Sequence, residues 1–274
     1  MTEFLTYHPP PPLSDYVHIF WYSNGLQSPP HEKERVLPDG SIELVINLRE
    51  DIIKLYDKET HDHFTSYQGG SIISGPHSDF VVIDTASQTN TVGIHFKPGG
   101  AFPFFPVAIY ELWNTHLSLE QLWGGDKVKA LRERLLEARS PTFMFHILEQ
   151  FLIKMKKDTT NHPIITYALA KFQSPEYPLR ISDITDQINL SPRHFIDIFK
   201  KEVGLTPKQF WRVQRFQHIL SSIHKVDSID WMDIALACGY YDQAHFIHDF
   251  RSFSGIKPTA YQSNQDFKNH VPLF

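Results

Sequence analysis

Two segments near the C-terminal end of the chain carry the same side-chain types at the same spacing, and several of these side chains are hydrogen-bond donors. At an offset of 51 residues, six identities fall between positions 194 and 210: His194, Phe195, Ile196, Phe199, Gly204 and Pro207 meet His245, Phe246, Ile247, Phe250, Gly255 and Pro258. Ordinary composition would give about one such identity by chance. Arginine, lysine, glutamine and histidine in and beside these positions can donate to base edges and phosphate oxygens. The repeat therefore indicates two related units able to contact nucleic acid.

Each unit is expected to be a pair of helices joined by a tight turn. Ser191-Pro192 and Asp242 are N-cap signals, while Gly204 and Gly255 are stop signals. The helices expected from these signals and from apolar spacing span 181–188 and 193–203 in the first unit, 207–223 between the units, and 229–238 and 242–253 in the second.

A helix that reads DNA in the major groove needs a buried face and an exposed face. Phe195, Ile198 and Phe199 can face inward in the first unit, and Phe246 and Phe250 in the second. The residues expected to contact DNA are Arg193, Ile196, Asp197, Lys200, Lys201, Arg212, Gln243, Ala244, Ile247, His248 and Arg251. Arg193 is expected to read a base, and Lys200 and Arg212 to hold phosphates.

These segments resemble the DNA-binding domain of the AraC-type (arabinose-regulator-like) transcription regulators. The resemblance covers roughly the last 100 residues and rests on 190–195, 199–207, 233–235, 238–240, 242–246, 250–251, 255–258 and Tyr261. It implies an all-α domain with two helix-turn-helix units, a bacterial source, and a variable N-terminal domain for effector sensing or dimerisation. The sequence departs from the family's pattern at Asp197 and His248, where a basic residue is common.

The N-terminal part is expected to be an antiparallel β-barrel of cupin-like form, which makes the whole chain an α+β multidomain protein. Short apolar runs of period two lie between 17 and 115, separated by breakers such as Gly75-Pro76. The pieces 36–40, 74–76 and 93–100 resemble, more faintly, an uncharacterised domain often fused ahead of such DNA-binding units. The residues expected to line an effector cavity are Trp21, Tyr22, Arg35, Glu43, His95 and Phe96.

We expect three parts: a sensor or dimerisation domain at 1–117, a helical connector at 118–160, and the double helix-turn-helix domain at 161–274. The last part carries 12 Lys+Arg and 11 Asp+Glu, a balance of +1, against −6 for the remainder, which together give the net charge of −5. Helices of the connector are expected to transmit a signal between the other two parts. The expected partners are double-stranded DNA, a small-molecule effector, RNA polymerase and a second copy of the chain.

Residues suited to metal or disulfide chemistry do not converge in the sequence. Cys238 is the one cysteine, which excludes an intramolecular disulfide and a cysteine-based zinc cluster. His61 and His63 form half of a cupin metal motif, but no glutamate follows at a suitable spacing. We therefore expect no catalytic centre, no metal and no cofactor. No signal-peptide pattern and no run of about 20 apolar residues is present, so a cytoplasmic protein without a membrane span is expected.

Two alternatives to an effector-responsive regulator stay open at this point. In the first, the N-terminal domain only dimerises or binds a partner. In the second, a cupin-type enzyme is fused to a DNA-binding domain.

Overall fold

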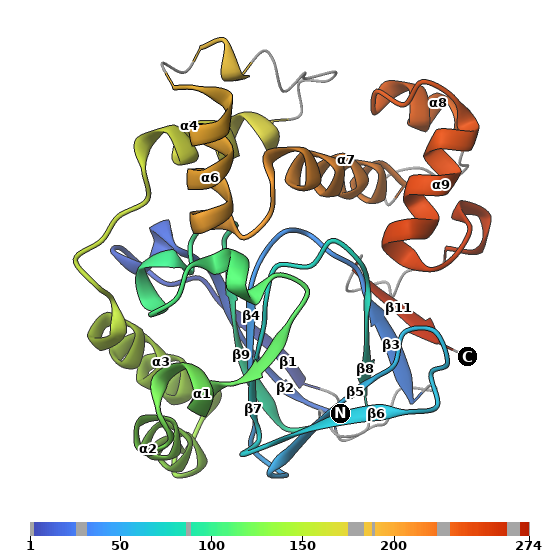
Figure 1. The fold of residues 1–274 in the computed structure, drawn as a ribbon. Coiled ribbons are helices and arrows are strands. Elements are labelled where there is room, and N and C mark those ends of the chain that lie inside the picture. The colour runs from blue at the N-terminus through green and yellow to red at the C-terminus, as the bar shows by residue number, and fades with distance from the viewer. Residues whose placement is uncertain are drawn as a thin grey trace.

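The computed structural model describes residues 3–25, 32–85, 89–174, 184–187, 190–223, 231–261 and 269–273. Strands from the N-terminal part form two sheets, and helices α1 to α3 lie beside them (Figure 1). The remaining helices lie over the other end of the sheets, with α7 running between α6 on one side and α8 and α9 on the other (Figure 1). The expected α+β class, with a β N-terminal part and a helical C-terminal part, is confirmed.

Eleven strands among the described residues form one six-stranded and one five-stranded sheet, and the pairs are antiparallel. The first sheet has the order β1 (Glu3–Tyr7), β2 (Val17–Asn24), β9 (Thr91–Phe96), β4 (Glu43–Asn47), β7 (Ser71–Ser74) and β10 (His116–Ser118). The second has the order β11 (His270–Leu273), β3 (Lys33–Val36), β8 (Val81–Asp84), β5 (Ile52–Tyr56) and β6 (Phe64–Gln68).

The expected barrel is not closed. The chain leaves the second sheet after β6 and enters the first at β7 through Gly69 and Gly70, whose φ angles are 84° and 65°. Such positive φ angles suit glycine, which has no Cβ to clash with the backbone. The corner lets consecutive strands join different sheets, so the strands form two layers instead of one continuous ring.

Successive residues of β4 point to opposite faces of the sheet, and both faces of this strand are buried by apolar neighbours. Leu44 and Ile46 belong to a large cluster that includes side chains from α1, α2 and α3. Val45 faces the other way and packs with Ile53 and Leu55 of the second sheet. The period-two pattern in the sequence therefore buries both sides of the strand, one against helices and one against strands.

Helices α1 (Leu119–Trp123), α2 (Gly125–Leu136) and α3 (Pro141–Met155) lie within the segment 118–160, whose role as a connector stays a prediction. At the start of α1, the backbone N–H of Ser118 donates to Oε1 of Gln121 over 3.2 Å, as in a capping box. Ser140 caps α3 by accepting from the backbone N–H of Phe143 over 3.3 Å.

The C-terminal helices are α4 (Pro163–Phe172), α6 (Pro192–Val203), α7 (Pro207–Ile223), α8 (Trp231–Ala237) and α9 (Gln243–Ser254), with 3₁₀ helices at Leu13–Asp15, Phe102–Phe104, Ile109–Leu112 and Pro258–Ala260. The helix expected over 181–188 and its turn at 189 lie outside the described residues, apart from 184–187. No helix in the described ranges is both long enough and apolar enough to cross a membrane.

The C-terminal end of the chain returns to the N-terminal sheets. Strand β11 pairs with β3, with His270 opposite Val36. Val271 and Leu37 are buried in the same cluster as side chains of α7 and α9. The last residues therefore join the N-terminal sheet to the helical part.

The turn Pro38-Asp39-Gly40 lies directly on α7. Gln214 donates from Nε2 to the carbonyl oxygen of Asp39 over 2.7 Å, and Gln217 donates to the carbonyl oxygen of Pro38 over 2.7 Å. A Cβ at Gly40 would lie 2.7 Å from Cε2 of Phe210, so the turn approaches the helix more closely than any other residue type permits.

The segment from Gly75 to Phe80 contacts the ends of both α6 and α9. A Cβ at Gly204, which ends α6, would lie 2.4 Å from Cγ of Pro76, and a Cβ at Gly255, which ends α9, would lie 2.7 Å from the ring of Phe80. Both glycines are left-handed, with φ of 87° and 72°. The two halves therefore touch directly at these two helix ends, in addition to being joined through the segment 118–160.

The contact at Gly255 can be measured with a double-mutant cycle. We expect Gly255→Ala to lower the free energy of unfolding by about 1–2 kcal/mol for the left-handed backbone and by about 1–3 kcal/mol more for the clash with Phe80. In a Phe80→Ala background only the backbone part should remain. Urea unfolding of the four full-length proteins gives both values. Equal penalties in the two backgrounds would show that the Phe80 ring does not rest on Gly255.

Candidate nucleic-acid interface

Helix α6 presents one buried and one exposed face, as the repeat predicts. It begins at the N-cap Ser191, whose Oγ accepts from the backbone N–H of His194 over 3.3 Å, and ends at Gly204. Phe195, Ile198 and Phe199 pack into the core with α4 and α7. Arg193, Ile196, Asp197 and Lys201 are exposed, whereas Lys200 is half-buried.

Helix α9 repeats this arrangement. Its N-cap Asp242 accepts from the backbone N–H of His245 over 2.7 Å, and Gly255 ends the helix. Phe246, Phe250 and Phe253 are buried. The residues expected to reach DNA, Gln243, Ala244, Ile247, His248 and Arg251, are all exposed. The structure therefore brings the candidate reading residues onto the outer sides of two equivalent helices.

Two lysines at the end of α6 lie over aromatic rings of the N-terminal part. The Nζ of Lys200 is 5.6 Å from the ring centre of Tyr110, and the Nζ of Lys201 is 5.7 Å from that of Phe102. A cation attracted to a ring face contributes to holding the two surfaces together. These lysines therefore contact the N-terminal part in this structure.

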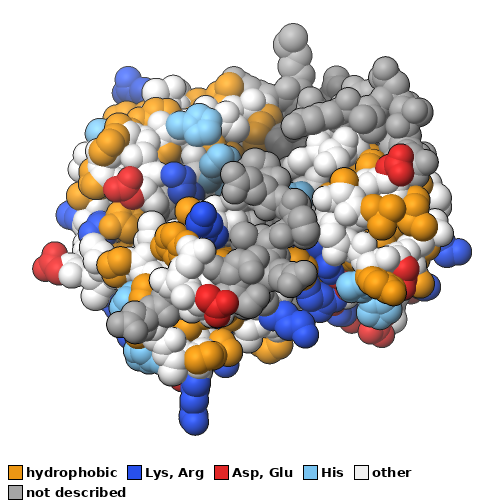
Figure 2. Space-filling view, turned by 90° about the horizontal axis from the view of Figure 1, so that it is seen from above, with side chains coloured by type: hydrophobic (Ala, Val, Ile, Leu, Met, Phe, Trp, Pro, Cys, Tyr) orange, Lys and Arg blue, Asp and Glu red, His pale blue; other side chains and the backbone are white. Residues whose placement is uncertain are grey.

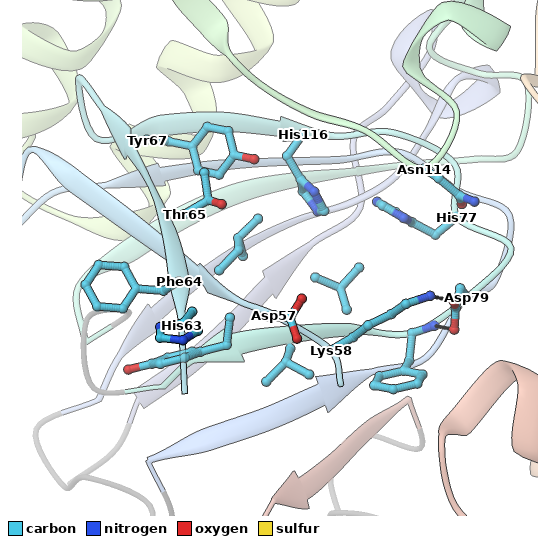
Figure 3. Close-up of a pocket in the computed structure, with 15 residues that line it drawn as sticks. Asp57, Lys58, His63, Phe64, Thr65, Tyr67, His77, Asp79, Asn114 and His116 are labelled. Carbon is cyan, nitrogen blue, oxygen red and sulfur yellow. Dashed lines mark hydrogen bonds and ion pairs between the residues drawn. The ribbon is translucent and has the colours of Figure 1, made fainter. Parts of the chain in front are cut away.

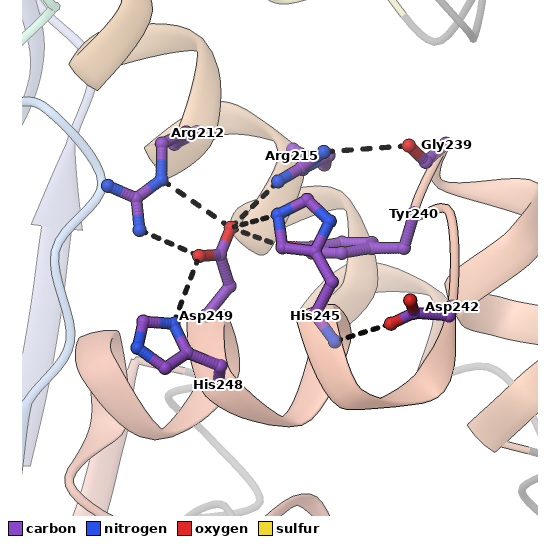
Figure 4. Close-up of polar contacts among 8 residues, drawn as sticks. All are labelled: Arg212, Arg215, Gly239, Tyr240, Asp242, His245, His248 and Asp249. Carbon is purple, nitrogen blue, oxygen red and sulfur yellow. Dashed lines mark hydrogen bonds and ion pairs between the residues drawn. The ribbon is translucent and has the colours of Figure 1, made fainter.

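Arg212 is engaged in a buried ion cluster between α7 and α9 (Figure 4). Its Nη2 lies 2.7 Å from Oδ1 of Asp249, and Nη2 of Arg215 lies 2.7 Å from Oδ2 of the same carboxylate. The side chains of Asp249 and Arg215 are 2% and 3% exposed. The guanidinium of Arg215 also stacks on Tyr240, 3.7 Å from its ring centre.

The charge of Asp249 is held by its two arginine partners. Burial acts to raise the pKa of Asp249, but hydrogen bonds and charges from Arg212 and Arg215 outweigh it, so the net pKa lies below its ordinary value. The carboxylate therefore orients α9, which carries candidate DNA-contacting residues, relative to the joining helix α7. Asp249 is not among the residues expected from the sequence to act in this domain.

The repeat contained a signal for the role of Asp249. At the offset of 51 residues Asp249 aligns with Ile198, an inward-facing position. A carboxylate at an inward position requires buried partners. The partners here are Arg212 and Arg215, which lie three residues apart on the joining helix and form ion pairs with Asp249.

Lysine and arginine side chains are scattered over the face that carries α6 to α9 (Figure 2). Hydrophobic side chains also reach the surface there, among them Ile196 and Ile247, which are 40% and 36% exposed. Exposed apolar groups on a reading helix can contact thymine methyl groups, while arginine and glutamine donate to purine edges. The exposed faces of α6 and α9 therefore carry both apolar and hydrogen-bonding side chains.

The six residues expected to form an effector cavity do not come together. Tyr22 and Phe96 are buried in the main core. Arg35 lies on β3 of the second sheet, over the ring of Phe80. Only Trp21, Glu43 and His95 meet: Trp21 Nε1 donates to Oε1 of Glu43, and Nδ1 of His95 contacts Oε2 of the same carboxylate.

His95 is also tied to the turn that touches α7. Its Nε2 lies 3.1 Å from Oδ2 of Asp39. Burial acts to lower the pKa of His95, but the charges of Glu43 and Asp39 outweigh it and raise the pKa well above its ordinary value. A cationic imidazole between two carboxylates therefore holds the Pro38–Gly40 turn. Within the described residues, no group of three or more histidine, cysteine, aspartate or glutamate side chains is placed to hold a metal ion.

We expect Asp249→Asn to lower the free energy of unfolding by about 3–5 kcal/mol at neutral pH, because Arg215 would keep a buried charge without a counter-charge. Since the folded pKa is lowered, the contribution of the carboxylate is complete above the unfolded pKa of about 3.9 and is lost as the pH falls through the folded value. Urea unfolding of both proteins from neutral to acidic pH measures this difference.

Asp197→Asn on the exposed face of α6 is the matched control, for which a change within about 0.5 kcal/mol is expected. Equal effects of the two substitutions would contradict the structural role of Asp249.

Two parts of the chain match known families. Residues 5–118 match the family described as "Domain of unknown function (DUF6597)", and residues 184–264 match the family described as "Helix-turn-helix domain".

Curated relatives and solved structures add to these matches. The melibiose operon regulatory protein of Escherichia coli strain K12 is 27% identical over 84 residues, which are 31% of this chain and 28% of that protein. The HTH-type transcriptional regulator ArgR of Pseudomonas aeruginosa is 30% identical over 103 residues, 36% of this chain and 30% of that protein. The chain thus spans about a third or less of the length of these relatives. The structure of ToxT from Vibrio cholerae aligns with a TM-score of 0.46 and 14% identity, over 84% of this chain and 95% of that one.

The family matches and the curated relatives identify the C-terminal part of this chain as an AraC-type helix-turn-helix domain. It follows a domain of unknown function, and its curated relatives include AraC-family regulators.

Proposed function

We propose that the chain is a transcription regulator that binds specific double-stranded DNA sequences through α6 and α9 and responds to a small effector bound by its N-terminal part. One observation carries the DNA-binding proposal: two helices expose their outer faces, and α7 joins them. Each begins at an N-cap side chain that accepts from the backbone N–H three residues on, buries a phenylalanine pair and ends at a left-handed glycine. Two such helices can enter successive major grooves on one side of a duplex.

Different residues serve different parts of this recognition. Arg193 and Gln243, in the first turns of their helices, donate to base edges. Ile196, Ala244 and Ile247 contact apolar base surfaces, and Asp197 accepts from a cytosine amino group. His248 replaces the usual cation of the second unit.

Contacts to the DNA phosphate backbone come from the cationic side chains near the C-terminal ends of α6 and α9. Arg251, which is exposed, holds phosphate oxygens. Lys200 and Lys201 reach phosphates only by leaving the rings of Tyr110 and Phe102. Arg212 acts through Asp249 and positions α9.

The functional division that we propose follows 1–117 as sensor, 118–160 as connector and 161–274 as reader, with β11 as the link that returns to the sensor. Because the proposed partner is chromosomal DNA, the proposal places the protein in the cytoplasm of a bacterial cell. The proposed activity is DNA binding and not catalysis. RNA polymerase and a second copy of the chain stay predicted partners.

The proposal is tested by selecting bound sites from random duplex DNA with the purified full-length chain. Recovery of one recurrent motif is expected. Binding that shows no sequence preference at any salt concentration, or no binding at low salt, would contradict the proposed function. Low salt is the stringent condition because phosphate contacts weaken as salt rises.

With the selected site in hand, we expect Arg193→Ala to weaken binding by about 1–3 kcal/mol and to relax preference at one base position. Arg251→Ala should weaken all sequences alike and reduce the salt slope by about 1. Band-shift titrations against the selected site and its single-base variants, at several salt concentrations, separate the two effects. If both substitutions change specificity in the same way, the division between base reading and phosphate contact is wrong.

A further inference from the structure

A cavity of about 460 Å³ lies between the β5–β6 hairpin and the segment that leads into β8 (Figure 3). Its volume falls within the range of about 300–1,000 Å³ that small-molecule sites occupy. Two histidines, His77 and His116, point toward one another inside it (Figure 3). None of the residues assigned above to DNA contact or to the His95 cluster lines this cavity.

Ser74 joins the two histidines. Its Oγ lies 3.1 Å from Nε2 of His77 and 3.1 Å from Nε2 of His116, and the two rings stack with centres 4.7 Å apart. The other ring nitrogen, Nδ1, makes no hydrogen bond to a described residue in either ring and is not closed off from solvent.

The two free nitrogens have opposite character. Among the described residues, Ser74 Oγ has hydrogen-bond contacts with these two ring nitrogens alone, so its one proton is donated to one imidazole and its oxygen accepts from the other. One ring then carries its proton on Nδ1 and the other on Nε2. Burial lowers the pKa of His77 to about 4 and that of His116 to about 3, so both rings are neutral near pH 7. The pair therefore presents one donor and one acceptor side by side.

Charge in the cavity opposes an anionic ligand. Lys58 is paired with Asp79, and Asp57 adds a second carboxylate, which the backbone N–H groups of Glu59 and Thr60 stabilise as an anion. Aromatic side chains (Tyr56, Phe64, Tyr67 and Phe80) and aliphatic side chains (Leu55, Val81 and Val82) form much of the remaining wall. Phe64 at its edge is 50% exposed and lies in edge contact with Tyr56, with ring centres 5.7 Å apart.

We propose that this cavity is the effector site and that it binds a small, planar, uncharged molecule with a hydrogen-bond donor beside an acceptor, such as a lactam, carboxamide or nucleobase edge. His77 and His116 read the donor and the acceptor, Ser74 locks their complementary tautomers, and the aromatic wall covers the planar body. The site extends the function proposed above by naming the class of its effector.

The same chain segment connects the cavity to both reading units. His77, Asp79 and Phe80 line the cavity. Pro76 touches the end of α6 at Gly204, and Phe80 touches the end of α9 at Gly255. Asn114 holds the segment in place, since its Oδ1 accepts from the backbone N–H of Ser78 over 2.9 Å and its own N–H donates to the carbonyl oxygen of Pro76 over 3.2 Å. Occupation of the cavity thus acts on a segment that both reading helices contact.

The tautomers are tested first, without a ligand. Long-range proton–nitrogen NMR spectra of the full-length chain with labelled histidine should show one Nδ1–H and one Nε2–H neutral imidazole, assigned through His77→Phe and His116→Phe. The same tautomer in both rings, or a charged ring at neutral pH, would overturn the proposal.

Binding is tested next with pyridone, a planar lactam, as the probe. Pyridone should shift both Nδ1 signals with a dissociation constant on the order of 1 mM, as expected for so small a molecule. N-methylpyridone lacks the donor and should bind at least about tenfold more weakly, and benzoate, a planar anion, should behave in the same way. Ser74→Ala should weaken pyridone binding, while Ser23→Ala, on β2 of the same sheet and outside the cavity lining, serves as the matched control variant. No shift with pyridone, or equal binding of benzoate, would overturn the site.

Hydrogen exchange then measures transmission in the absence of DNA. Pyridone should slow exchange in the last turns of α6 and α9, and unchanged exchange there would overturn the coupling. A chain that binds pyridone but no DNA would contradict the function proposed above and leave the site intact. A chain that binds specific DNA but not pyridone would overturn the site and leave that function intact.

Discussion

The close approach of the two halves of the molecule depends on two positions that cannot carry a side chain. Gly204 and Gly255 end α6 and α9 in the left-handed conformation, and each rests against the segment from Gly75 to Phe80. A side chain at either position would meet Pro76, Ile109 or the Phe80 ring at less than 3 Å. One short loop of the N-terminal part therefore sets where both helices end and how they are oriented relative to the sheets.

Polar interactions complete this arrangement at the joining helix. The carbonyl oxygen of Asp39 accepts a hydrogen bond from Gln214 of α7, and its carboxylate forms an ion pair with His95. One residue therefore takes part in both the charged cluster of the sheet and the hydrogen bond to α7. On the other side of α7, Arg212 and Arg215 hold Asp249 of α9. Helix α7 thus carries the contacts that fix the N-terminal part on one side and the second reading unit on the other, which suits an element that must keep two reading helices at a constant separation.

Histidines take three different roles in this chain because their surroundings differ. Two carboxylates raise the pKa of His95, whereas burial lowers the pKa of His77, where it outweighs the charge of Asp79, and that of His116. His248 stays exposed on a reading helix. Residue type alone does not distinguish these cases, because the pKa of an imidazole follows from the charges and the desolvation around it.

The sequence by itself determined the local features: the caps at Ser191 and Asp242, the buried phenylalanines of both units, the exposed outer faces of α6 and α9 and the two-sided apolar pattern of β4. These features depend on spacing within one helix or strand, so periodicity is enough to predict them. The tertiary structure alone decided that Arg212 pairs with Asp249, that Arg35 lies away from Glu43, and that His77 meets His116. Arg212 and Asp249 lie 37 residues apart, and His77 and His116 lie 39 residues apart. Arg35 and Glu43 lie on different sheets. Their meeting depends on how whole elements pack, and that information is distributed over the entire core rather than written in any one segment.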